Sequence, residues 1–237
     1  MKNIAIITAR SGSKGLPDKN IKLLCGLPLI AYSIKEAIES KIFSRVMVST
    51  DSEKYADIAR KYGAEVPFLR SQEMSGDKAG SWDVVKEVLN NFKSLGEEFD
   101  TVCLLQPTSP LRQAVDIVDA YKLFEEKNAD NVIGVCESDH SPLWMNTLPK
   151  DLSLENFIRK DIQEKNRQQL DTYYRINGAM YITRVSTLMR GDSVYNNSFA
   201  FIMPKEKSVD IDSELDFIIA EALMNIRNEK GKGYNDA

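Results

Sequence analysis

The sequence TARSGSKGLPDKN occupies residues 8–20 and directly follows an apolar run, IAII, at residues 4–7. The apolar run predicts a buried first strand, and a glycine-bearing basic loop after such a strand is how nucleotide sites often begin in α/β proteins. Gly12 and Gly15 allow the backbone to turn sharply and to approach a ligand closely. We therefore expect an α/β fold in which this basic loop lies at the carboxyl end of a buried strand.

Three positive charges, Arg10, Lys14 and Lys19, fall within ten residues of the basic loop. Backbone N–H groups in such a turn can surround phosphate oxygens, so a polyphosphate ligand is expected here. The loop contains neither G-x-x-x-x-G-K-[ST] nor G-x-G-x-x-G, so P-loop kinases and Rossmann dehydrogenases match it poorly. The alternative interpretation of the same residues is a solvated basic turn without a ligand.

The composition is that of an ordinary globular protein, with 43% hydrophobic and 28% charged residues among 237. The net charge of -4 does not indicate a nucleic-acid-binding surface, and a local basic cluster fits a small anionic ligand better. No apolar run reaches about 18 residues, so no membrane helix is expected. The chain enters its first strand at once, which leaves no room for a signal peptide and predicts a cytoplasmic location. The three cysteines are far apart and form neither a disulfide framework nor a zinc pattern.

Beyond the basic loop, short apolar segments alternate with segments of helical periodicity. Extended segments are expected over residues 45–50, 65–70, 101–106, 131–136, 179–183 and 199–203. Helices are expected over residues 28–40, 51–62, 83–95 and 114–127, and from residue 213 to a polar, frayed tail at 227–237. This alternation predicts a mostly parallel central sheet flanked by helices. Ligands bind beyond the carboxyl ends of strands in such sheets, so Arg10, Asp51 and Gln106 should meet at one edge.

Residues 138–172 interrupt the alternation and show little regular periodicity. We expect them to form an arm inserted into a single domain that spans residues 1–237. If apolar side chains such as Trp144 and Leu152 find no partner within the chain, the arm would form a dimer contact. The alternative is that the arm packs on its own domain.

Asp210 and Asp212 are two residues apart, so in an extended segment their carboxylates point to the same side. Two carboxylates beside a polyphosphate suit Mg²⁺, which prefers one or two carboxylates together with phosphate oxygens and water. Alternatively, Ser213 and Asp216 form a helix capping box, and Asp212 only complements the helix dipole. Capping does not explain Asp210, which favours the metal interpretation.

Five motifs appear in order along the chain: ARSGSKGLPDKN at 9–20, LLQPTSPLR at 104–112, RQQ at 167–169, RINGAMYI at 175–182 and DIDSELD at 210–216. With these motifs, over nearly its whole length, the chain resembles the acylneuraminate cytidylyltransferase family, which includes the CMP-sialic acid synthetases. The resemblance implies a nucleotidyltransferase-type, Rossmann-like fold, Mg²⁺ and a homodimer built on the arm. The reaction it implies joins CMP from CTP to a nine-carbon 2-keto-3-deoxy acid sugar and releases pyrophosphate.

The resemblance also implies residue roles. The nucleotide-binding positions are Arg10, Lys14, Lys19, Asn20, Arg70 and Ser81. The sugar-binding positions are Gln106, Arg167, Arg175 and Tyr181. Asp210 and Asp212 match the metal-binding pair. Arg10 and Lys19 would act in catalysis, Arg10 by stabilising charge that develops on the triphosphate and Lys19, with Lys14, by holding phosphate oxygens. Beyond the resemblance, we infer that Asp212 helps to deprotonate the attacking hydroxyl, directly or through metal-bound water. If the arm is exchanged between protomers, Arg167 would serve the partner's site.

Several alternatives stay open. Sialic, legionaminic and pseudaminic acids share the carboxylate and differ in ring substituents, and no residue of the sequence selects among them. A CMP-Kdo synthetase would share the basic loop, although RQQ together with RINGAMYI favours nine-carbon sugars. A non-catalytic nucleotide-sugar binding protein is disfavoured because Arg10, Lys19, Asp210 and Asp212 are all present. A glycosyltransferase is disfavoured because its metal-binding pair usually lies in mid-chain, after a strand.

Overall fold

The computed structural model describes residues 1–12, 15–76 and 79–232. Within them, six strands form a central sheet in the order β4-β1-β5-β7-β6-β8, and β2 and β3 form a separate hairpin. The strands are β1 (Asn3–Thr8), β2 (Leu23–Leu24), β3 (Leu27–Pro28), β4 (Arg45–Ser49), β5 (Thr101–Leu105), β6 (Asn131–Glu137), β7 (Tyr174–Arg184) and β8 (Ser198–Ile202).

All strands of the central sheet run in the same direction except β7, which is antiparallel to both of its neighbours. The mostly parallel α/β sheet expected from the alternation is therefore confirmed. Because β7 runs in the opposite direction, its first half lies at the carboxyl ends of β5 and β6. Met180 pairs with Leu105, and Tyr174 pairs with Glu137.

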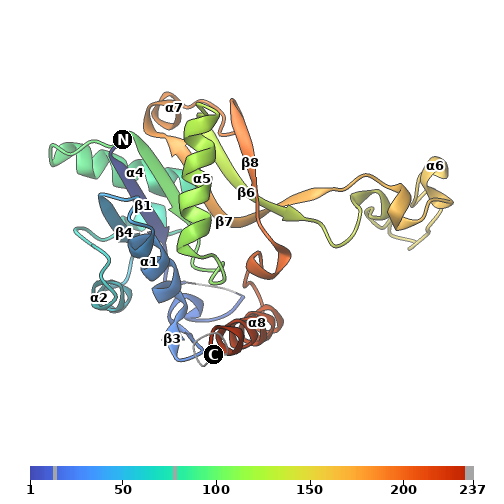
Figure 1. The fold of residues 1–237 in the computed structure, drawn as a ribbon, viewed down its shortest axis with the longest axis horizontal. Coiled ribbons are helices and arrows are strands. Elements are labelled where there is room, and N and C mark those ends of the chain that lie inside the picture. Colours follow the sequence, from blue (N-terminus) through green and yellow to red (C-terminus); the bar gives the residue numbers. More distant parts are fainter. Residues whose placement is uncertain (13–14, 77–78, 233–237) are drawn as a thin grey trace.

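Helices cover both faces of this sheet (Figure 1). The α-helices are α1 (Leu29–Ser40), α2 (Glu53–Lys61), α3 (Gln72–Ser75), α4 (Ser81–Ser94), α5 (Ala114–Glu126), α6 (Lys160–Gln163), α7 (Val185–Arg190) and α8 (Glu214–Lys232), and the short 3₁₀ helices are η1 (Lys19–Ile21), η2 (Pro142–Trp144), η3 (Arg167–Gln169) and η4 (Lys205–Lys207). No helix among the described residues is long and apolar enough to cross a membrane.

The buried strand β1 shows why the sequence IAII is apolar at every position. Ala5 and Ile7 belong to a core cluster with residues of α1, α2 and α5, whereas Ile4 and Ile6 belong to a second cluster with residues of α4 and α7. Successive side chains of a strand point to opposite faces, so a strand covered on both faces cannot alternate apolar and polar residues. The basic loop therefore starts directly at the end of a strand that is buried on both faces.

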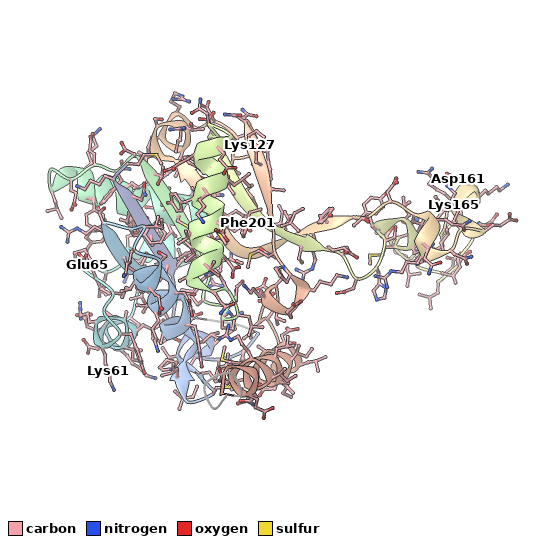
Figure 2. The ribbon with its side chains drawn as sticks, viewed as in Figure 1. Lys61, Glu65, Lys127, Asp161, Lys165 and Phe201 are labelled. Atoms are coloured by element: carbon pink, nitrogen blue, oxygen red, sulfur yellow. The ribbon has the colours of Figure 1, made fainter. Side chains whose placement is uncertain are left out.

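Residues 138–172 leave the end of β6, project away from the body and return into β7 (Figure 1). Asp161 and Lys165 mark the far end of this arm in Figure 2. At its root, the backbone N–H of Ser138 donates to the carbonyl of Tyr173 at 2.8 Å, which extends the pairing of β6 and β7 into the arm. The arm exposes large apolar side chains, namely Met145, Leu148, Leu152 and Leu154.

Three sequence expectations differ from the structure. Residues 65–70 do not form a strand but make an isolated bridge at Glu65, because Pro67 has no N–H to continue a ladder. The tail expected to be frayed at 227–237 is helical as far as Lys232, where α8 ends, and residues 233–237 lie outside the described residues. Strand β7 begins at Tyr174, earlier than the expected start at residue 179.

Candidate active site

A cavity of about 600 Å³ opens at the carboxyl edge of the sheet, beyond the ends of β1 and β5. Its walls come from described residues of the basic loop, from residues 70–76 and 79–84, from the loop after β5 and from the segment before α8. The sequence-predicted residues that line it are Arg10, Lys19, Asn20, Arg70, Ser81, Gln106, Asp210 and Asp212. Asp51 joins the same edge through a hydrogen bond from the backbone N–H of Ser11, as its position after β4 predicted.

The basic loop and the acidic pair meet in this cavity although they lie at opposite ends of the sequence. Lys19 Nζ donates to the carbonyl of Ile211 at 2.6 Å and to the carboxylate of Asp212 at 2.9 Å. A Cβ on Gly15 would lie 2.8 Å from the carbonyl oxygen of Asp212, so a larger residue there would push the two segments apart. Asn20 Nδ2 donates to the carbonyl of Arg10 at 3.1 Å and closes the loop.

The two carboxylates have different surroundings. Asp210 is half-buried, and burial raises its pKa; a hydrogen bond from Thr108 opposes this rise, and the nearby charge of Asp212 adds to it. The side chain of Asp212 is 78% exposed and points to Lys19. Asp216 caps the start of α8 together with Ser213. Its carboxylate accepts hydrogen bonds from Ser213 N at 2.8 Å and from Ser213 Oγ at 2.7 Å. The expected capping box exists, and it leaves the Asp212 carboxylate available to the cavity.

Asp210 and Asp212 fit Mg²⁺ only as part of a larger ligand set. Among the described residues, no group of three or more His, Cys, Asp or Glu side chains gathers as a metal site. Mg²⁺ commonly takes one or two protein carboxylates and completes its shell with substrate phosphates and water. The half-buried Asp210 would gain from a cation, because a positive charge offsets the penalty that burial places on its charged form.

Arg70 lines a second wall of the cavity. Its side chain is buried, with Nε donating to Ser49 Oγ at 3.1 Å and Nη2 donating to the Ser49 carbonyl at 2.6 Å. Burial lowers the pKa of this guanidinium, an effect that the charge of Asp51 opposes. Ser81 lies nearby in the first turn of α4, whose free backbone N–H groups favour polar ligands. These residues can donate hydrogen bonds to acceptor atoms of a ligand.

Two residues that support Gln106 were present in the quoted motifs but had no expected role. Gly178 in β7 has a φ of +73°, and a Cβ there would lie 2.5 Å from Gln106 Oε1. Behind the cavity, the fully buried Arg112 donates to the carbonyl of Ala179 and to Ser33 Oγ, and Ser33 Oγ donates to the carbonyl of Gln106. The only signal in the sequence was the polar, proline-flanked setting of Arg112.

Three of the expected site residues do not line the cavity. Arg167 is exposed on the arm, and Arg175 is exposed at the start of β7, where it donates to the carbonyl of Ser208 at 3.0 Å. Tyr181 is half-buried with its ring edge-on to Trp82, at 6.0 Å between centroids, and burial raises its pKa. Lys14 lies outside the described residues.

Solved structures with the same fold are nucleotide-sugar and related cytidylyltransferases. A CMP:2-keto-3-deoxy-manno-octonic acid synthetase complexed with CTP has a TM-score of 0.72 at 17% identity, with 96% of this chain and 100% of that chain covered. A 4-diphosphocytidyl-2C-methyl-D-erythritol synthase from Anaerococcus prevotii has a TM-score of 0.62 at 14% identity, with 94% and 98% covered. At these identities the likeness concerns the fold alone.

Several proteins of related sequence match this chain over most of its length. An N-acylneuraminate cytidylyltransferase of Escherichia coli O18:K1:H7 is 38% identical over 97% of this chain and 54% of the relative, so the chain spans about half the length of that protein. A CMP-N,N'-diacetyllegionaminic acid synthase of Legionella pneumophila is 34% identical over 97% of this chain and 99% of the relative. A pseudaminic acid cytidylyltransferase of Campylobacter jejuni is 33% identical over 97% and 99%. The cytidylyltransferase family model matches residues 4–229, and the chain therefore belongs to the cytidylyltransferase family.

Proposed function

We propose that this protein transfers CMP from CTP to the anomeric hydroxyl of a nine-carbon 2-keto-3-deoxy acid sugar and releases pyrophosphate. The observation that carries the proposal is the 2.9 Å contact between Lys19 and Asp212, which joins a basic loop and a carboxylate pair in one cavity. Relatives over nearly the full chain are named for N,N'-diacetyllegionaminic and pseudaminic acids, which supports an acidic sugar as acceptor.

In this reaction the anomeric oxygen forms a bond to the α-phosphorus of CTP while the bond from that phosphorus to pyrophosphate breaks. Negative charge grows on the leaving pyrophosphate, and Arg10 and Lys19 line the cavity where they would stabilise it. The hydroxyl proton passes to Asp212 or to solvent. Arg70 and Ser81 would hold the nucleoside from their own wall of the cavity.

We propose Mg²⁺ as the cofactor, held by Asp210 and Asp212 together with phosphate oxygens. When bound, the ion supplies positive charge to the triphosphate as pyrophosphate departs. Asp212→Ala is expected to lower turnover at least about a hundredfold, the range seen when one preorganised electrostatic group is lost. The fold should survive, because this side chain is 78% exposed.

Asp216→Ala is the matched control for this test. It removes the helix cap, which is expected to cost about 1 kcal/mol of stability, and it leaves turnover nearly unchanged. Pyrophosphate release and chemical denaturation, measured on both variants, separate the two roles. Wild-type turnover in Asp212→Ala would show that Asp212 has no part in the reaction.

For the acid sugar, we propose that Arg167 and Arg175 hold the carboxylate, since a guanidinium can bind a carboxylate through two hydrogen bonds. Arg167 lies on the projecting arm and not on the cavity of its own chain, which favours a homodimer in which it reaches the partner's site. The exposed apolar side chains of the arm, such as Leu152 at 70% exposure, support the same assembly.

A pyrophosphate-release assay with CTP and Mg²⁺ against a panel of acid sugars tests the proposed function. Sialic, legionaminic and pseudaminic acids and Kdo form the panel, and at least one of the nine-carbon sugars is expected to react. Kdo is the second candidate acceptor, because a CMP-Kdo synthetase shares the fold at a TM-score of 0.72. Reaction with Kdo and with none of the nine-carbon sugars would contradict the assignment.

A further inference from the structure

The basic loop is anchored at two points by residues that do not line the cavity. Asp51 contacts Ser11 and Tyr55 contacts Asp18, and neither Asp51 nor Tyr55 is among the cavity-lining residues. Between these anchors the loop is largely exposed at Gly12 and at residues 15–18. Ordering an exposed loop costs conformational entropy, so the anchors decide how well its shape is defined.

The first anchor is the carboxylate of Asp51, just past the end of β4. One oxygen accepts from the backbone N–H of Ser11 at 2.8 Å, and the other accepts from Ser11 Oγ at 2.8 Å. Hydrogen bonds to a charged acceptor are stronger than those between neutral groups, and two of them fix orientation as well as distance. The strand pairing also extends into the loop, because Ala9 N donates to the Ser49 carbonyl at 2.9 Å.

The second anchor is the hydroxyl of Tyr55 in α2, whose ring is buried. It donates to the carboxylate of Asp18 at 3.0 Å. Asp18 has a φ of +53°, uncommon for a residue with a side chain, and its carbonyl accepts from Ile21 N and Lys22 N to begin η1. A side chain that holds Asp18 therefore holds the start of η1. Lys54 also contacts Asp18 at 3.2 Å, but both groups are mostly exposed and this pair contributes little.

Each anchored residue is the direct sequence neighbour of a cation in the cavity. Ser11 follows Arg10, and Asp18 precedes Lys19. Asp51 lies two residues before α2 begins and Tyr55 lies in the first turn of α2, so residues four apart in the sequence hold both Ser11 and Asp18. Small displacements of catalytic groups cost rate or affinity, because charge stabilisation depends on preorganised geometry.

We propose that Asp51 and Tyr55 are positioning residues that hold the described ends of the basic loop, and with them Arg10 and Lys19, in place to receive the triphosphate. They act through Ser11 and Asp18 and do not touch the substrate. The inference rests on the proposed CTP site, and it adds two residues that no expected role covers.

Steady-state kinetics of variants test this role. Asp51→Ala removes both acceptors and is expected to raise the KM for CTP about tenfold, with the KM for the sugar unchanged. Asp51→Asn keeps an acceptor for Ser11 N–H, and the Ser11 hydroxyl can turn to accept from the amide, so its KM should stay within about threefold of wild type. Tyr55→Phe, which keeps the buried ring, should raise the KM for CTP about threefold to tenfold.

Matched controls lie in the same helix. Asp57→Ala is the control for Asp51→Ala, because Asp57 accepts a hydrogen bond from Arg60 at 3.0 Å. Tyr62→Phe is the control for Tyr55→Phe, because Tyr62 lies at the end of α2. Both controls are expected to keep the wild-type KM for CTP. If Asp51→Asn proved as defective as Asp51→Ala while hydrogen–deuterium exchange over residues 9–22 stayed at the wild-type rate in both variants, the charge of Asp51 and not its hold on Ser11 would matter, and the positioning role would be wrong.

Hydrogen–deuterium exchange of the peptide that covers residues 9–22 gives a readout that does not depend on activity. Exchange should accelerate in Asp51→Ala and in Tyr55→Phe, and it should match wild type in both controls. Unchanged exchange and an unchanged KM for CTP in these two variants would overturn the proposal. If the wild-type protein releases no pyrophosphate from CTP, the proposed function fails, but exchange still decides whether the two residues fix the loop.

Discussion

Gly178 leaves space for two polar side chains of the cavity, Gln106 and Asp210, because it has no side chain of its own. It lies in β7 with a φ of +73°, and a Cβ there would lie 2.5 Å from Gln106 Oε1 and 3.5 Å from Asp210 Oδ2. Glycine adopts this backbone conformation without steric cost and leaves the room that both polar side chains occupy. Because β7 is antiparallel to β5, its first half lies at the carboxyl end of β5, and its backbone at Gly178 lies next to Gln106.

We predict that Gly178→Ala lowers the free energy of unfolding by about 3 kcal/mol, since backbone strain and overpacking add. Gly191 provides the control: its φ is +81°, but nothing lies within 4 Å of a Cβ built there. Gly191→Ala should therefore show strain alone, about 1 kcal/mol. Urea denaturation of both variants measures the difference, and equal losses would mean that the contact with Gln106 contributes nothing.

At the residue scale, the sequence was enough to expect that charged residues such as Lys19 and Asp212 share a cavity. It did not predict the residues that support them through contacts between packed elements. The charges of Lys19 and Asp212 and their places after a strand and before a helix were enough to expect a shared site. The contact of Ser11 with Asp51 spans 40 positions, and that of Arg112 with Ser33 spans 79. Such contacts depend on how elements pack, which residue spacing does not encode.

At the element scale, ion pairs tie the amino edge of the sheet together. Lys2 Nζ lies 2.8 Å from one carboxylate oxygen of Glu97, and Arg45 Nη2 lies 3.1 Å from the other. Arg45 also contacts Glu65 at 2.6 Å. The hydrogen bonds from Lys2 and Arg45 hold the pKa of Glu97 below its ordinary value of 4.5.

This lowered pKa predicts a pH dependence of stability. A carboxylate with a depressed pKa in the folded state stabilises the protein above its unfolded pKa and loses that contribution as pH falls through the folded value. Glu97→Gln should therefore be about 1 kcal/mol less stable than wild type at pH 7, and the difference should shrink as pH falls below 4.5 and vanish once pH is below the lowered pKa of the folded state. Urea denaturation across this range checks it; a difference that persists in acid would assign the effect to packing.

The sequence predicted most elements because buried strands and amphipathic helices have different periodicities. It did not predict the direction of β7, since an apolar segment reads the same whichever way its neighbours run. Residues 65–70 had strand-like composition, and Pro67 reduced them to a single bridge. The short helices α3 and α7 have too few residues for periodicity to show.

At the scale of the whole molecule, the projecting arm is the feature that leaves large apolar side chains exposed. Leu152 and Leu154 are 70% and 65% exposed on it. The loss of periodicity at residues 138–172 was visible in the sequence, but the direction in which the arm projects was not. The pairing of β6 with β7 continues into the root of the arm, through the hydrogen bond from Ser138 N to the Tyr173 carbonyl.

We predict that the protein sediments as a dimer and that the double variant Leu152→Asp/Leu154→Asp weakens dimerisation more than about a hundredfold, because two apolar anchors become charged. Leu95→Asp is the matched control, since Leu95 is 69% exposed at the end of α4, away from the arm. Sedimentation velocity should show a dimer for the control. A monomeric wild type, or a dimeric arm variant, would contradict the proposed assembly.

The central claim is that the basic loop and the acidic pair form one site for a metal-bridged triphosphate. The most direct test is calorimetric titration of CTP with Mg²⁺ and with a chelator. Wild type should bind CTP about tenfold or more tightly with Mg²⁺, a typical coupling between two ligands. In Asp210→Asn/Asp212→Asn this factor should fall to about one, whereas Asp216→Asn should keep it. The same Mg²⁺ dependence in the double variant and in wild type would contradict the account.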